Sequence, residues 1–334
     1  MSIIILTKNK EQGLKLRDIL KQKDRRFEDI PCLVKEDIIQ NPENSQTVIS
    51  IFSTWYMPIF SESEIQRYFP LLKAIYYVAG TVKYFAEPFL NLKIKIYSAS
   101  TANCIPVAEF TVAQILLANK GYFQAQRAYR FPIWRKGFNA IRKNAELRYG
   151  NYGATVGIIG CGAIGSKVVE LLKPHNLKII VYDPYVSDER IALLGVKRVQ
   201  LNALFATADV ITNHLPDTPE TRGLIGYDLF SQMKKTATFI NTGRGAQVVE
   251  KDLSKILRKN PNISALLDVT KHEPLYPWSP LFWNKNVFLS PHLAGSISNE
   301  YIRMVDFIVQ IYHNDIQGIK NNYEISLELL QNKA

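Results

Sequence analysis

The sequence predicts an α/β protein with two domains, each built on a doubly wound parallel sheet. Three observations lead to this expectation. The length of 334 residues suits two domains of ordinary size. Short apolar runs alternate with helical or irregular stretches, which is typical of parallel sheets. A glycine-rich turn also follows one of these runs directly, as in dinucleotide-binding folds.

The first hundred residues alternate apolar runs with polar helical stretches. Strands are expected at residues 3–6, 47–52, 74–78 and 94–98. The apolar start lacks a basic leader and a small-residue cleavage site, so we interpret it as a first strand rather than a signal peptide. Residues 107–119 are apolar on nearly every side, which predicts a buried helix between domains or subunits. Residues 121–153 are basic and aromatic without clean periodicity, and are expected to form an arm or crossover.

From residue 155 the alternation becomes regular. Strands are expected at residues 156–159, 177–183, 210–213, 236–241, 264–269 and 286–290. A helix is expected to begin at the glycine-rich turn and continue through Leu172. The last helix, over residues 297–316, is long and amphipathic and can return to the first domain.

The net charge of +11 has two interpretations. One is nucleic-acid binding, and the other is a basic surface that attracts anionic substrates. Lys and Arg are spread along the chain, and no nucleic-acid-binding motif accompanies them, which favours the second. We therefore expect a small-molecule partner and no nucleic acid.

The three cysteines are far apart and odd in number, so neither a disulfide framework nor a metal site is expected. A reducing cytoplasm fits this pattern. No apolar run approaches the ~20 residues that span a bilayer, so no membrane association is expected.

The strongest local motif is GCGAIG at residues 160–165, which fits G-x-G-x-x-G between an expected strand and an expected helix. In this motif Gly160 permits the tight turn, Gly162 lets the backbone approach a pyrophosphate, and Gly165 lets the helix pack on the strand. The pyrophosphate would lie at a helix N-terminus, which favours anions. Asp183 ends the next strand, where an acid binds the ribose hydroxyls. Because a carboxylate repels a 2′-phosphate, NAD or NADH is favoured over NADP.

The alternative is that these glycines form an ordinary turn that Asp183 caps. The order of strand, glycines, helix, strand and acid favours the cofactor interpretation. Cys161, inside the turn, is either a redox-sensitive thiol or a small side chain where bulk is not tolerated. Nothing in the sequence shows how its thiolate would be stabilised, which favours the second.

Three further segments follow expected strands, at the sheet edge where open α/β folds bind ligands. NTGRG at 241–245 carries Arg244, DVTKHEP at 268–274 carries Glu273, and SPHLAG at 290–295 carries His292. Reduction of a 2-keto acid needs a fixed cation for the carboxylate and carbonyl, which suits Arg. It also needs a proton donor near neutral pH, which suits His, and a carboxylate that orients the imidazole and favours its protonated form.

Each of these residues also has an ordinary structural interpretation. Arg244 can be a surface ion-pair partner, Glu273 a loop residue before a proline, and His292 a satisfied core histidine.

Together the segments resemble the D-isomer-specific 2-hydroxyacid dehydrogenases, which carry N-T-x-R-G, D-V-x-x-x-E-P and P-H-x-A/G. The intervals of 29 residues from Arg244 to Glu273 and 19 to His292 are typical of that family. HLP at 214–216 with the TPETR that follows at 218–222 resembles its H-L-P-x-T-x-E-T-R stretch, and VAE at 107–109 the start of its interdomain helix. The resemblance is dense over residues 103–295 and loose before them.

The resemblance implies a flavodoxin-like substrate domain of residues 1–104 plus 297–334. A Rossmann NAD-binding domain of residues 105–296 is inserted into it, and the active site lies in the cleft between them. It implies an NAD-dependent oxidoreductase that interconverts a small 2-keto acid and its D-2-hydroxy acid, with His292 as general acid/base. A homodimer built through the nucleotide-binding domains is expected.

The resemblance also implies binding roles. Asp268 would bond the nicotinamide carboxamide. Backbone N–H groups around Ala79, Gly80 and Thr81 would hold the substrate carboxylate with Arg244. The expected cofactor contacts are Gly160, Gly162, Ala163, Ile164, Gly165, Asp183, Pro184, His214, Pro216, Thr221, Thr242, Asp268 and Gly295.

The chain departs from the family in one place. The family often reads G-x-G-x-D after the third strand, whereas residues 80–84 read GTVKY, which leaves the identity of the substrate open. Trp55 and Tyr56 follow a strand end and are expected to face the cleft and select the substrate side chain. The other interpretation is that they cover the core.

Two other functions stay open on this fold. Formate dehydrogenases of related sequence typically pair the His with Gln, so Glu273 argues against formate oxidation but leaves phosphite oxidation open. An NAD(H)-sensing corepressor is the alternative from another class. It would be expected to show a peptide-docking cleft and extra tails, and few residues lie beyond the expected domains.

Overall fold

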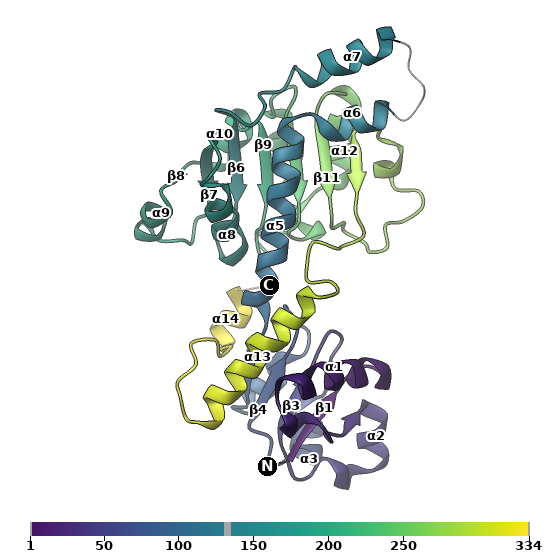
Figure 1. The fold of residues 1–334 in the computed structure, drawn as a ribbon, viewed down its shortest axis with the longest axis vertical. Helices are drawn as coiled ribbons and strands as arrows, with labels where there is room; N and C mark the ends of the chain where they lie inside the picture. The colour runs from purple at the N-terminus through teal and green to yellow at the C-terminus, as the bar shows by residue number, and fades with distance from the viewer. Residues whose placement is uncertain (1, 130–134, 333–334) are drawn as a thin grey trace. The chain divides into compact units, whose positions relative to one another are not determined.

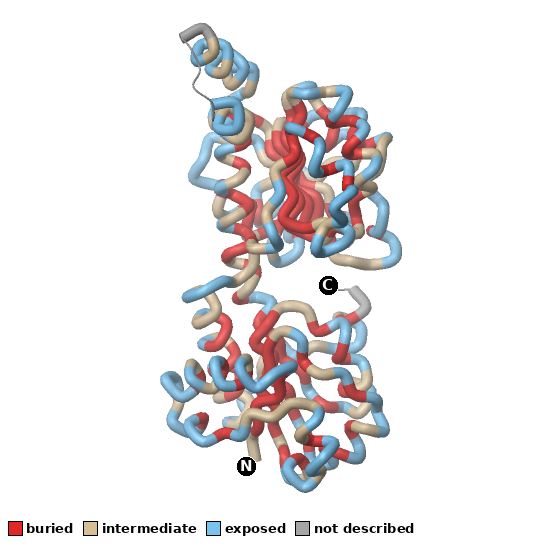
Figure 2. The backbone as a smooth tube through the Cα atoms, turned by 90° about the vertical axis from the view of Figure 1, so that its right-hand side faces the viewer, coloured by how far each residue is buried: buried red, intermediate tan, exposed pale blue. Residues whose placement is uncertain are grey.

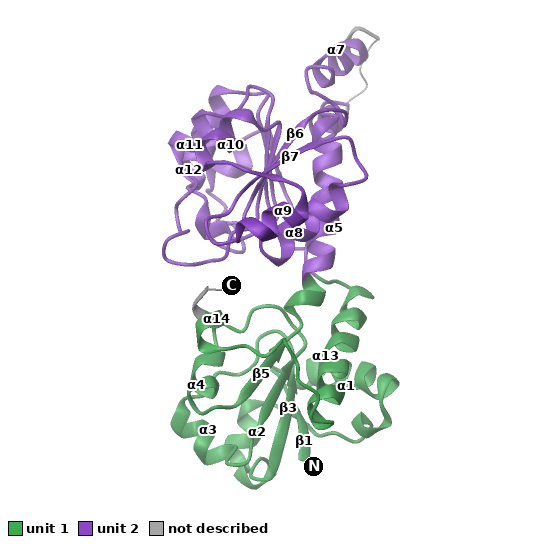
Figure 3. Ribbon diagram, turned by 90° about the vertical axis from the view of Figure 1, so that its left-hand side faces the viewer, with its two compact units in different colours: residues 1–103, 296–334 green, residues 104–295 purple. Residues whose placement is uncertain are grey.

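The computed structural model describes residues 2–129 and 135–332. The chain divides into two compact units, unit 1 with residues 1–103 and 296–334 and unit 2 with residues 104–295 (Figure 3). Both junctions lie one residue before the expected boundaries. Each unit is a parallel sheet with helices on its faces, so the expected fold of two doubly wound domains, one inserted into the other, is confirmed.

Unit 1 has a five-stranded parallel sheet in the order β2-β1-β3-β4-β5, which is the flavodoxin order. The strands are β1 (Ser2–Leu6), β2 (Cys32–Leu33), β3 (Val48–Ser53), β4 (Ala74–Tyr77) and β5 (Lys95–Ser98). Only β2 was not predicted, because two residues are too short to show a period. The strand order reverses between β1 and β3, and at such a switch point open α/β sheets bind ligands.

Helices cover both faces of this sheet. They are α1 (Lys10–Lys23), α2 (Lys35–Gln40), α3 (Glu62–Tyr68), α4 (Ala86–Asn91), α13 (Glu300–Ile316) and α14 (Leu327–Asn332). Helix α1 packs beside α13, and α3 and α14 pack beside α4 (Figure 3). The C-terminal helix α13 therefore completes the unit that the N-terminal residues begin.

Aromatic rings on three adjacent strands explain why α13 packs here. Phe52, Tyr76 and Tyr97 are cross-strand neighbours, with ring centroids 5.0 Å and 5.6 Å apart. Tyr312 of α13 meets Phe52 and Tyr76 edge to face at 5.3 Å and 5.2 Å. One turn further on, Asp315 accepts hydrogen bonds from the Tyr76 and Tyr97 hydroxyls at 2.7 Å and 3.1 Å. The buried tyrosine hydroxyls are thus satisfied by the helix that covers them.

Unit 2 has a seven-stranded parallel sheet in the order β12-β11-β10-β9-β6-β7-β8, the Rossmann order with one added strand. The strands are β6 (Thr155–Ile159), β7 (Lys178–Tyr182), β8 (Lys197–Arg198), β9 (Val210–Asn213), β10 (Thr238–Asn241), β11 (Ser264–Leu267) and β12 (Val287–Leu289). The two-residue β8 is again the strand that periodicity missed. Figure 2 shows the strands as the buried centre of the unit.

Most helices of unit 2 lie in two layers, one on each face of the sheet. They are α5 (Ser100–Asn119), α6 (Tyr122–Ala128), α7 (Arg135–Ala145), α8 (Ala163–Leu172), α9 (Asp188–Leu194), α10 (Leu201–Thr207), α11 (Tyr227–Ser231) and α12 (Glu250–Lys259) (Figure 1). Phe239 of β10 packs in the core beneath α10, α11 and α12, and the next residue, Ile240, packs in the core beneath α5 and α8. Buried residues on both faces of a strand are the signature of a doubly wound sheet. Short 3₁₀ turns are formed by Arg25–Phe27, Pro42–Asn44, Gly245–Gln247 and Pro280–Trp283.

Two expectations for this unit need correction. Residues 121–153 contain the helices α6 and α7 rather than only an irregular arm. Helix α5, with 20 residues and a mean hydropathy of 1.3 in its most apolar window, is long and apolar enough to span a membrane, so an apolar segment of that length does occur. Half of that window is buried inside the structure, where α5 covers the sheet.

Candidate active site

The three chemical segments follow three neighbouring strands. Strand β11 pairs with β10 on one side and with β12 on the other. Arg244 comes after β10, Glu273 after β11 and His292 after β12. Because carboxyl ends of parallel strands meet at one sheet edge, residues far apart in sequence are brought to one place.

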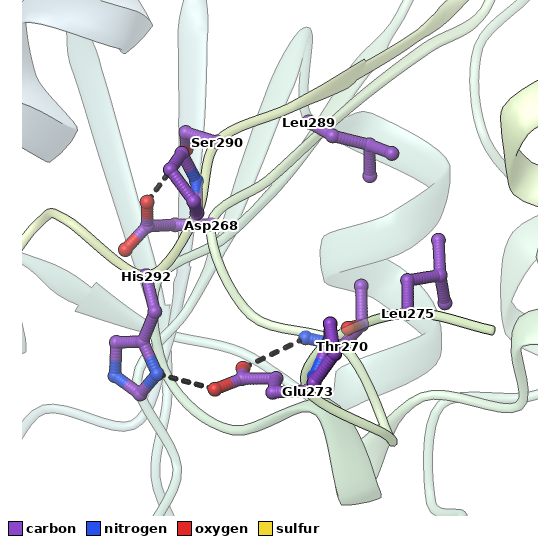
Figure 4. A pocket seen from close by; sticks show the side chains of 9 residues that line it. Asp268, Thr270, Glu273, Leu275, Leu289, Ser290 and His292 are labelled. Carbon is purple, nitrogen blue, oxygen red and sulfur yellow. Dashed lines mark hydrogen bonds and ion pairs between the residues drawn. The ribbon is translucent and has the colours of Figure 1, made fainter. Parts of the chain in front are cut away.

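Glu273 and His292 form a pair (Figure 4). Nδ1 of His292 lies 2.6 Å from Oε2 of Glu273, and the other carboxylate oxygen accepts a hydrogen bond from Thr270 N at 3.2 Å. Within residues 2–129 and 135–332, no group hydrogen-bonds to Nε2 of His292. The carboxylate therefore fixes the ring and leaves Nε2 available to a ligand.

Asp268 holds the turn that carries His292. Its Oδ1 accepts hydrogen bonds from the Ser290 hydroxyl at 2.5 Å and Leu293 N at 3.0 Å, and its Oδ2 from Ala294 N at 2.9 Å. His292 has a φ of +51°, a left-handed conformation that is costly for a residue with a side chain. The buried carboxylate supplies the contacts that hold it there. The sequence did not reveal this role; contact of Asp268 with the nicotinamide stays a prediction.

Arg244 is held beside this pair. Its guanidinium donates to Gly243 O at 2.8 Å, and its backbone N–H donates to Oε1 of Gln247 at 3.3 Å. Burial lowers the pKa of Arg244, while the charges of Asp217 and Glu273 act in the opposite direction. Arginine remains protonated under such a shift, so the site holds a fixed cation.

A cavity of about 400 Å³ opens beside the Glu–His pair. Its walls are formed by Asp268, Thr270, Glu273, Pro274, Leu275, Leu289, Ser290, Pro291 and His292. Figure 4 shows Leu275 and Leu289 together on the side of the cavity away from the His292 ring. The cavity is therefore polar next to Glu273 and His292 and apolar on its other side, where the two leucines lie.

The glycine-rich turn has the geometry that its motif predicts. Gly160 has a φ of +83°, and a Cβ on it would lie 2.9 Å from the backbone of His214. A Cβ on Gly165 would lie 2.0 Å from Gly160 O, so helix α8 packs as closely as a glycine allows. A Cβ on Gly162 would meet nothing within 4 Å. Space is therefore open at the one glycine whose role is to admit a ligand.

Residues next to Gly162 continue this open edge. Ala163 begins α8 and is exposed, and Ile164 is half-buried. With Gly162 at the N-cap, free backbone N–H groups of the first helical turn are available to an anion. Gly295, expected to contact the cofactor from the turn after His292, is half-buried.

Asp183 fastens the glycine turn to the end of β7. Its Oδ2 accepts a hydrogen bond from Cys161 N at 2.7 Å, and its Oδ1 from Tyr185 N and Val186 N at 2.8 Å and 3.1 Å. Asp183 therefore caps a turn, as the alternative interpretation expected. Contact of Asp183 with a ribose stays a prediction. Pro184 follows it and is exposed.

Cys161 is buried in the same turn, with 1% of its surface exposed. Burial raises the pKa of its thiol. A protonated thiol in an enclosed site is a poor nucleophile, which agrees with the interpretation of Cys161 as a small packing residue.

His214 lies in a chain of buried side chains. Its Nε2 is 3.0 Å from the Thr212 hydroxyl and its Nδ1 is 3.4 Å from the Thr242 hydroxyl, which lies 2.9 Å from that of Thr111 on α5. Burial lowers the pKa of His214 to about 3, so the ring is neutral at physiological pH. Thr111 was not anticipated, because a threonine inside an apolar helix carries no motif.

Gln247 is a second residue that the sequence did not reveal. It is fully buried, and its Nε2 donates to Leu215 O at 2.6 Å and Pro216 O at 2.8 Å. The Thr221 hydroxyl donates to Pro216 O at 2.6 Å. The HLP loop is thus fixed from two sides.

The expected substrate residues lie in unit 1. Ala79 is buried and Gly80 and Thr81 are half-buried, just after β4. Trp55 is half-buried and packs on Tyr301 of α13, with ring centroids 5.5 Å apart. Tyr56, in contrast, is 65% exposed. Trp55 therefore covers the core in part, whereas Tyr56 is free to meet a ligand.

Comparison with known proteins gives a consistent result. Residues 112–294 match the model of the D-isomer specific 2-hydroxyacid dehydrogenase family, NAD binding domain. A glyoxylate reductase from Korarchaeum cryptofilum is 30% identical over 284 residues, covering 83% of this chain and 81% of that protein. A D-3-phosphoglycerate dehydrogenase from Archaeoglobus fulgidus is 35% identical over 239 residues, covering 71% of this chain.

Coverage of these relatives is uneven. The match spans 44% of the Archaeoglobus protein, and a match to a glyoxylate reductase from Aeropyrum pernix, 38% identical over 218 residues, spans 64% of each chain. Among solved structures, D-mandelate dehydrogenase from Rhodotorula graminis has a TM-score of 0.79 at 19% identity, with 97% of both chains covered. An NAD-complexed D-isomer specific 2-hydroxyacid dehydrogenase from Lactobacillus delbrueckii ssp. bulgaricus has a TM-score of 0.75 at 20% identity, covering 97% of this chain and all of that one. These similarities show a shared fold.

Proposed function

Because the chain belongs to the D-isomer specific 2-hydroxyacid dehydrogenase family, we propose that it interconverts a small 2-keto acid and its D-2-hydroxy acid by NAD-dependent hydride transfer. The observation that carries this proposal is the 2.6 Å contact between His292 and Glu273, beside the fixed cation of Arg244. A cation, an oriented proton donor and a carboxylate are what the reaction requires of the protein.

Each residue has a defined part in keto-acid reduction. The guanidinium of Arg244 binds the substrate carboxylate and polarises the carbonyl. The protonated ring of His292 donates from Nε2 to the carbonyl oxygen, and Glu273 stabilises the charged ring before the transfer. In the oxidation direction the neutral ring accepts the hydroxyl proton. NAD, when bound, supplies or accepts the hydride.

The cofactor side of the proposal rests on unit 2. The open space at Gly162 and the first turn of α8 suit a pyrophosphate. We assign the ribose to Asp183 and further contacts to Thr242, Asp268 and Gly295. Asp183 also favours NAD over NADP, and replacing it with Ser should raise NADPH use relative to NADH. Equal use of both cofactors by the unaltered enzyme would contradict this assignment.

The substrate side of the proposal rests on unit 1. We assign contact with the substrate carboxylate to backbone N–H groups around Ala79, Gly80 and Thr81, as the family resemblance implies. Trp55 and Tyr56 select the substrate side chain. Unit 1 is thus the substrate domain and unit 2 the NAD-binding domain.

We further propose a cytoplasmic homodimer that associates through unit 2. Large side chains after α7 are exposed, with Leu147 at 54%, Tyr149 at 68% and Tyr152 at 79%. Contiguous exposed apolar groups mark association surfaces. Sedimentation should give twice the 38.1 kDa chain mass, and Tyr149→Ser with Tyr152→Ser should lower it towards one chain. A monomer at all concentrations contradicts the dimer.

The test of the activity follows NADH loss by absorbance with a panel of 2-keto acids. His292→Ala and Arg244→Ala should abolish turnover while NADH binding, measured by fluorescence, is retained. If the unaltered protein binds NADH but reduces no keto acid, the proposed reaction is wrong. Phosphite oxidation and NADH-dependent partner binding are then the functions to measure.

A further inference from the structure

The carboxyl ends of β1 and β3 in unit 1 flank the point where the strand order reverses. Lys8 comes two residues after β1, and Tyr56 comes three residues after β3. A crevice for a ligand forms at such a switch point, so these two side chains occupy the place in unit 1 where the topology favours binding.

Tyr56 is held there in a conformation that is costly. Its φ is +65°, in the left-handed region that residues other than Gly and Asn avoid. The segment before it is anchored by the Thr54 hydroxyl, which donates to Val78 O at 3.1 Å and accepts from the Tyr301 hydroxyl at 3.0 Å. The structure around Tyr56 thus fixes the backbone while the ring stays exposed. Backbone strain of this kind is concentrated at ligand sites.

Lys8 lies over the exposed ring. Its Nζ is 5.0 Å from the centroid of the Tyr56 ring, within the range of a cation–π contact. Within the described parts of the chain, no carboxylate lies within ion-pair distance of Lys8. Asp37, the acid that reaches the start of α1, is paired with Lys10 at 3.2 Å. Lys8 is therefore a positioned cation without an anionic partner.

The neighbouring loop adds no negative charge. Residues 80–84 read GTVKY, with Tyr84 at the position of the acid in the G-x-G-x-D pattern. The Tyr84 hydroxyl lies 3.1 Å from that of buried Tyr77. The strand ends of unit 1 therefore present the cation of Lys8 beside tyrosine hydroxyl groups, which is the chemistry that recognises an anion.

Resting on the function proposed above, we propose that Lys8, held by Tyr56, binds a second anionic group of the substrate. The substrate is then a 2-keto acid with a carboxylate or a phosphate at its far end. An uncharged substrate side chain in this place would remove water from Lys8 without replacing the lost interaction, which disfavours purely apolar substrates.

The test compares two pairs of 2-keto acids that differ in the distal charge, of which the first pair is also similar in size. The kcat/KM for 2-oxoglutarate is measured against 2-oxohexanoate, and that for 3-phosphohydroxypyruvate against hydroxypyruvate. The unaltered enzyme should favour the charged member of at least one pair by about fivefold or more, the factor that an exposed ion pair of about 1 kcal/mol supplies. The pair that shows the preference identifies the distal group as carboxylate or phosphate.

Variants of Lys8 and Tyr56 test whether these side chains cause the preference for the charged substrate. Lys8→Met keeps the stem and removes the charge, so it should raise KM for the charged substrate about fivefold and leave the uncharged one unchanged; Lys8→Arg should restore the preference. Tyr56→Asn tolerates the left-handed backbone and removes the ring, so it should give a smaller loss. Lys15→Met, an exposed lysine on α1 paired with Glu11, is the matched control.

Each outcome separates the two proposals. Unchanged kinetics in a folded Lys8→Met enzyme, or a preference for the uncharged member of both pairs, overturns the anion site while keto-acid reduction stands. If none of the four keto acids is reduced although NADH binds, the proposed reaction fails, and with it the site that rests on it.

Discussion

A Cβ atom on Gly245 would lie 1.9 Å from the carbonyl carbon of Thr270. The loop that carries Arg244 is therefore pressed against the loop that carries Glu273, at a distance that only glycine permits. Backbone packing at Gly245 thus connects the loop of Arg244 to the loop of Glu273.

Replacement of Gly245 with Ala should force the two loops apart. We expect a loss of about 2–3 kcal/mol in the free energy of unfolding, measured by urea denaturation, because the clash is with backbone that cannot rotate away. The kcat/KM for keto-acid reduction should fall as well. Gly226→Ala is the control, because the nearest atom to its Cβ is a side-chain oxygen of Asp252 at 3.4 Å. Equal stability of the two variants would show that the loops can separate at little cost.

The glycines of the turn after β6 should separate cofactor binding from folding. Gly162→Ala meets no atom of the protein, so its urea midpoint should stay unchanged while the Kd for NADH rises about tenfold or more. Gly165→Ala would place a Cβ 2.0 Å from Gly160 O and should lower the urea midpoint. Unaltered NADH affinity in Gly162→Ala would remove the pyrophosphate from this turn.

Glu273→Gln should affect the two directions of the reaction unequally. The amide keeps the size of the side chain but removes the negative charge 2.6 Å from Nδ1. The charged imidazole needed for reduction loses its counter-charge, whereas the neutral imidazole needed for oxidation does not. We expect a loss of about tenfold to hundredfold in kcat for reduction and a smaller loss for oxidation. Equal losses in both directions would assign Glu273 a purely structural part; His292→Gln is the reference for complete loss of the proton donor.

His214 should make the folded state sensitive to acid. Its pKa of about 3 in the folded state lies below the ordinary value of 6.5, so the unfolded chain binds more protons between these values. The stability that comes from the neutral ring is complete above pH 6.5 and falls as the pH drops. Between pH 6.5 and 5 the loss should be about 2 kcal/mol, measured from urea midpoints.

The variant His214→Gln keeps a neutral polar group and should reduce that dependence on pH, at some cost in stability at pH 7. Exposed His175 gives the control, because His175→Gln should leave the pH dependence as it was. If His214→Gln keeps the full acid sensitivity, other groups are responsible for it.

Much of the fold could be predicted because buried strands of three or more residues stand out as short continuous apolar runs between helical stretches. The two-residue strands β2 and β8 could not, and neither could α7, of which the described side chains, residues 137–145, are exposed or half-buried. For such segments the tertiary context decides, and the local sequence carries little signal.

The residues of the candidate site also differ in whether the local sequence identifies them. Arg244, Glu273 and His292 could be found because each stands in a motif that follows a strand. Gln247 and Thr111 could not, because their importance comes from burial and hydrogen bonds to distant backbone and side chains. The hydrogen bonds between Asp268 and the turn of His292 could not be predicted either, because they depend on the register of β11 and β12.

Because unit 1 consists of two separate chain segments, it cannot be completed during synthesis until the C-terminal segment has been made. All of unit 2 is synthesised before residue 296, so it can fold as soon as it emerges. The first 103 residues must instead wait through about 190 residues of further synthesis, roughly 10–40 s, for the helix that contributes Met304, Ile308 and Tyr312. During that interval the stacked rings of Phe52, Tyr76 and Tyr97 lack their cover. We therefore expect chaperone binding during synthesis to be concentrated on the nascent N-terminal segment.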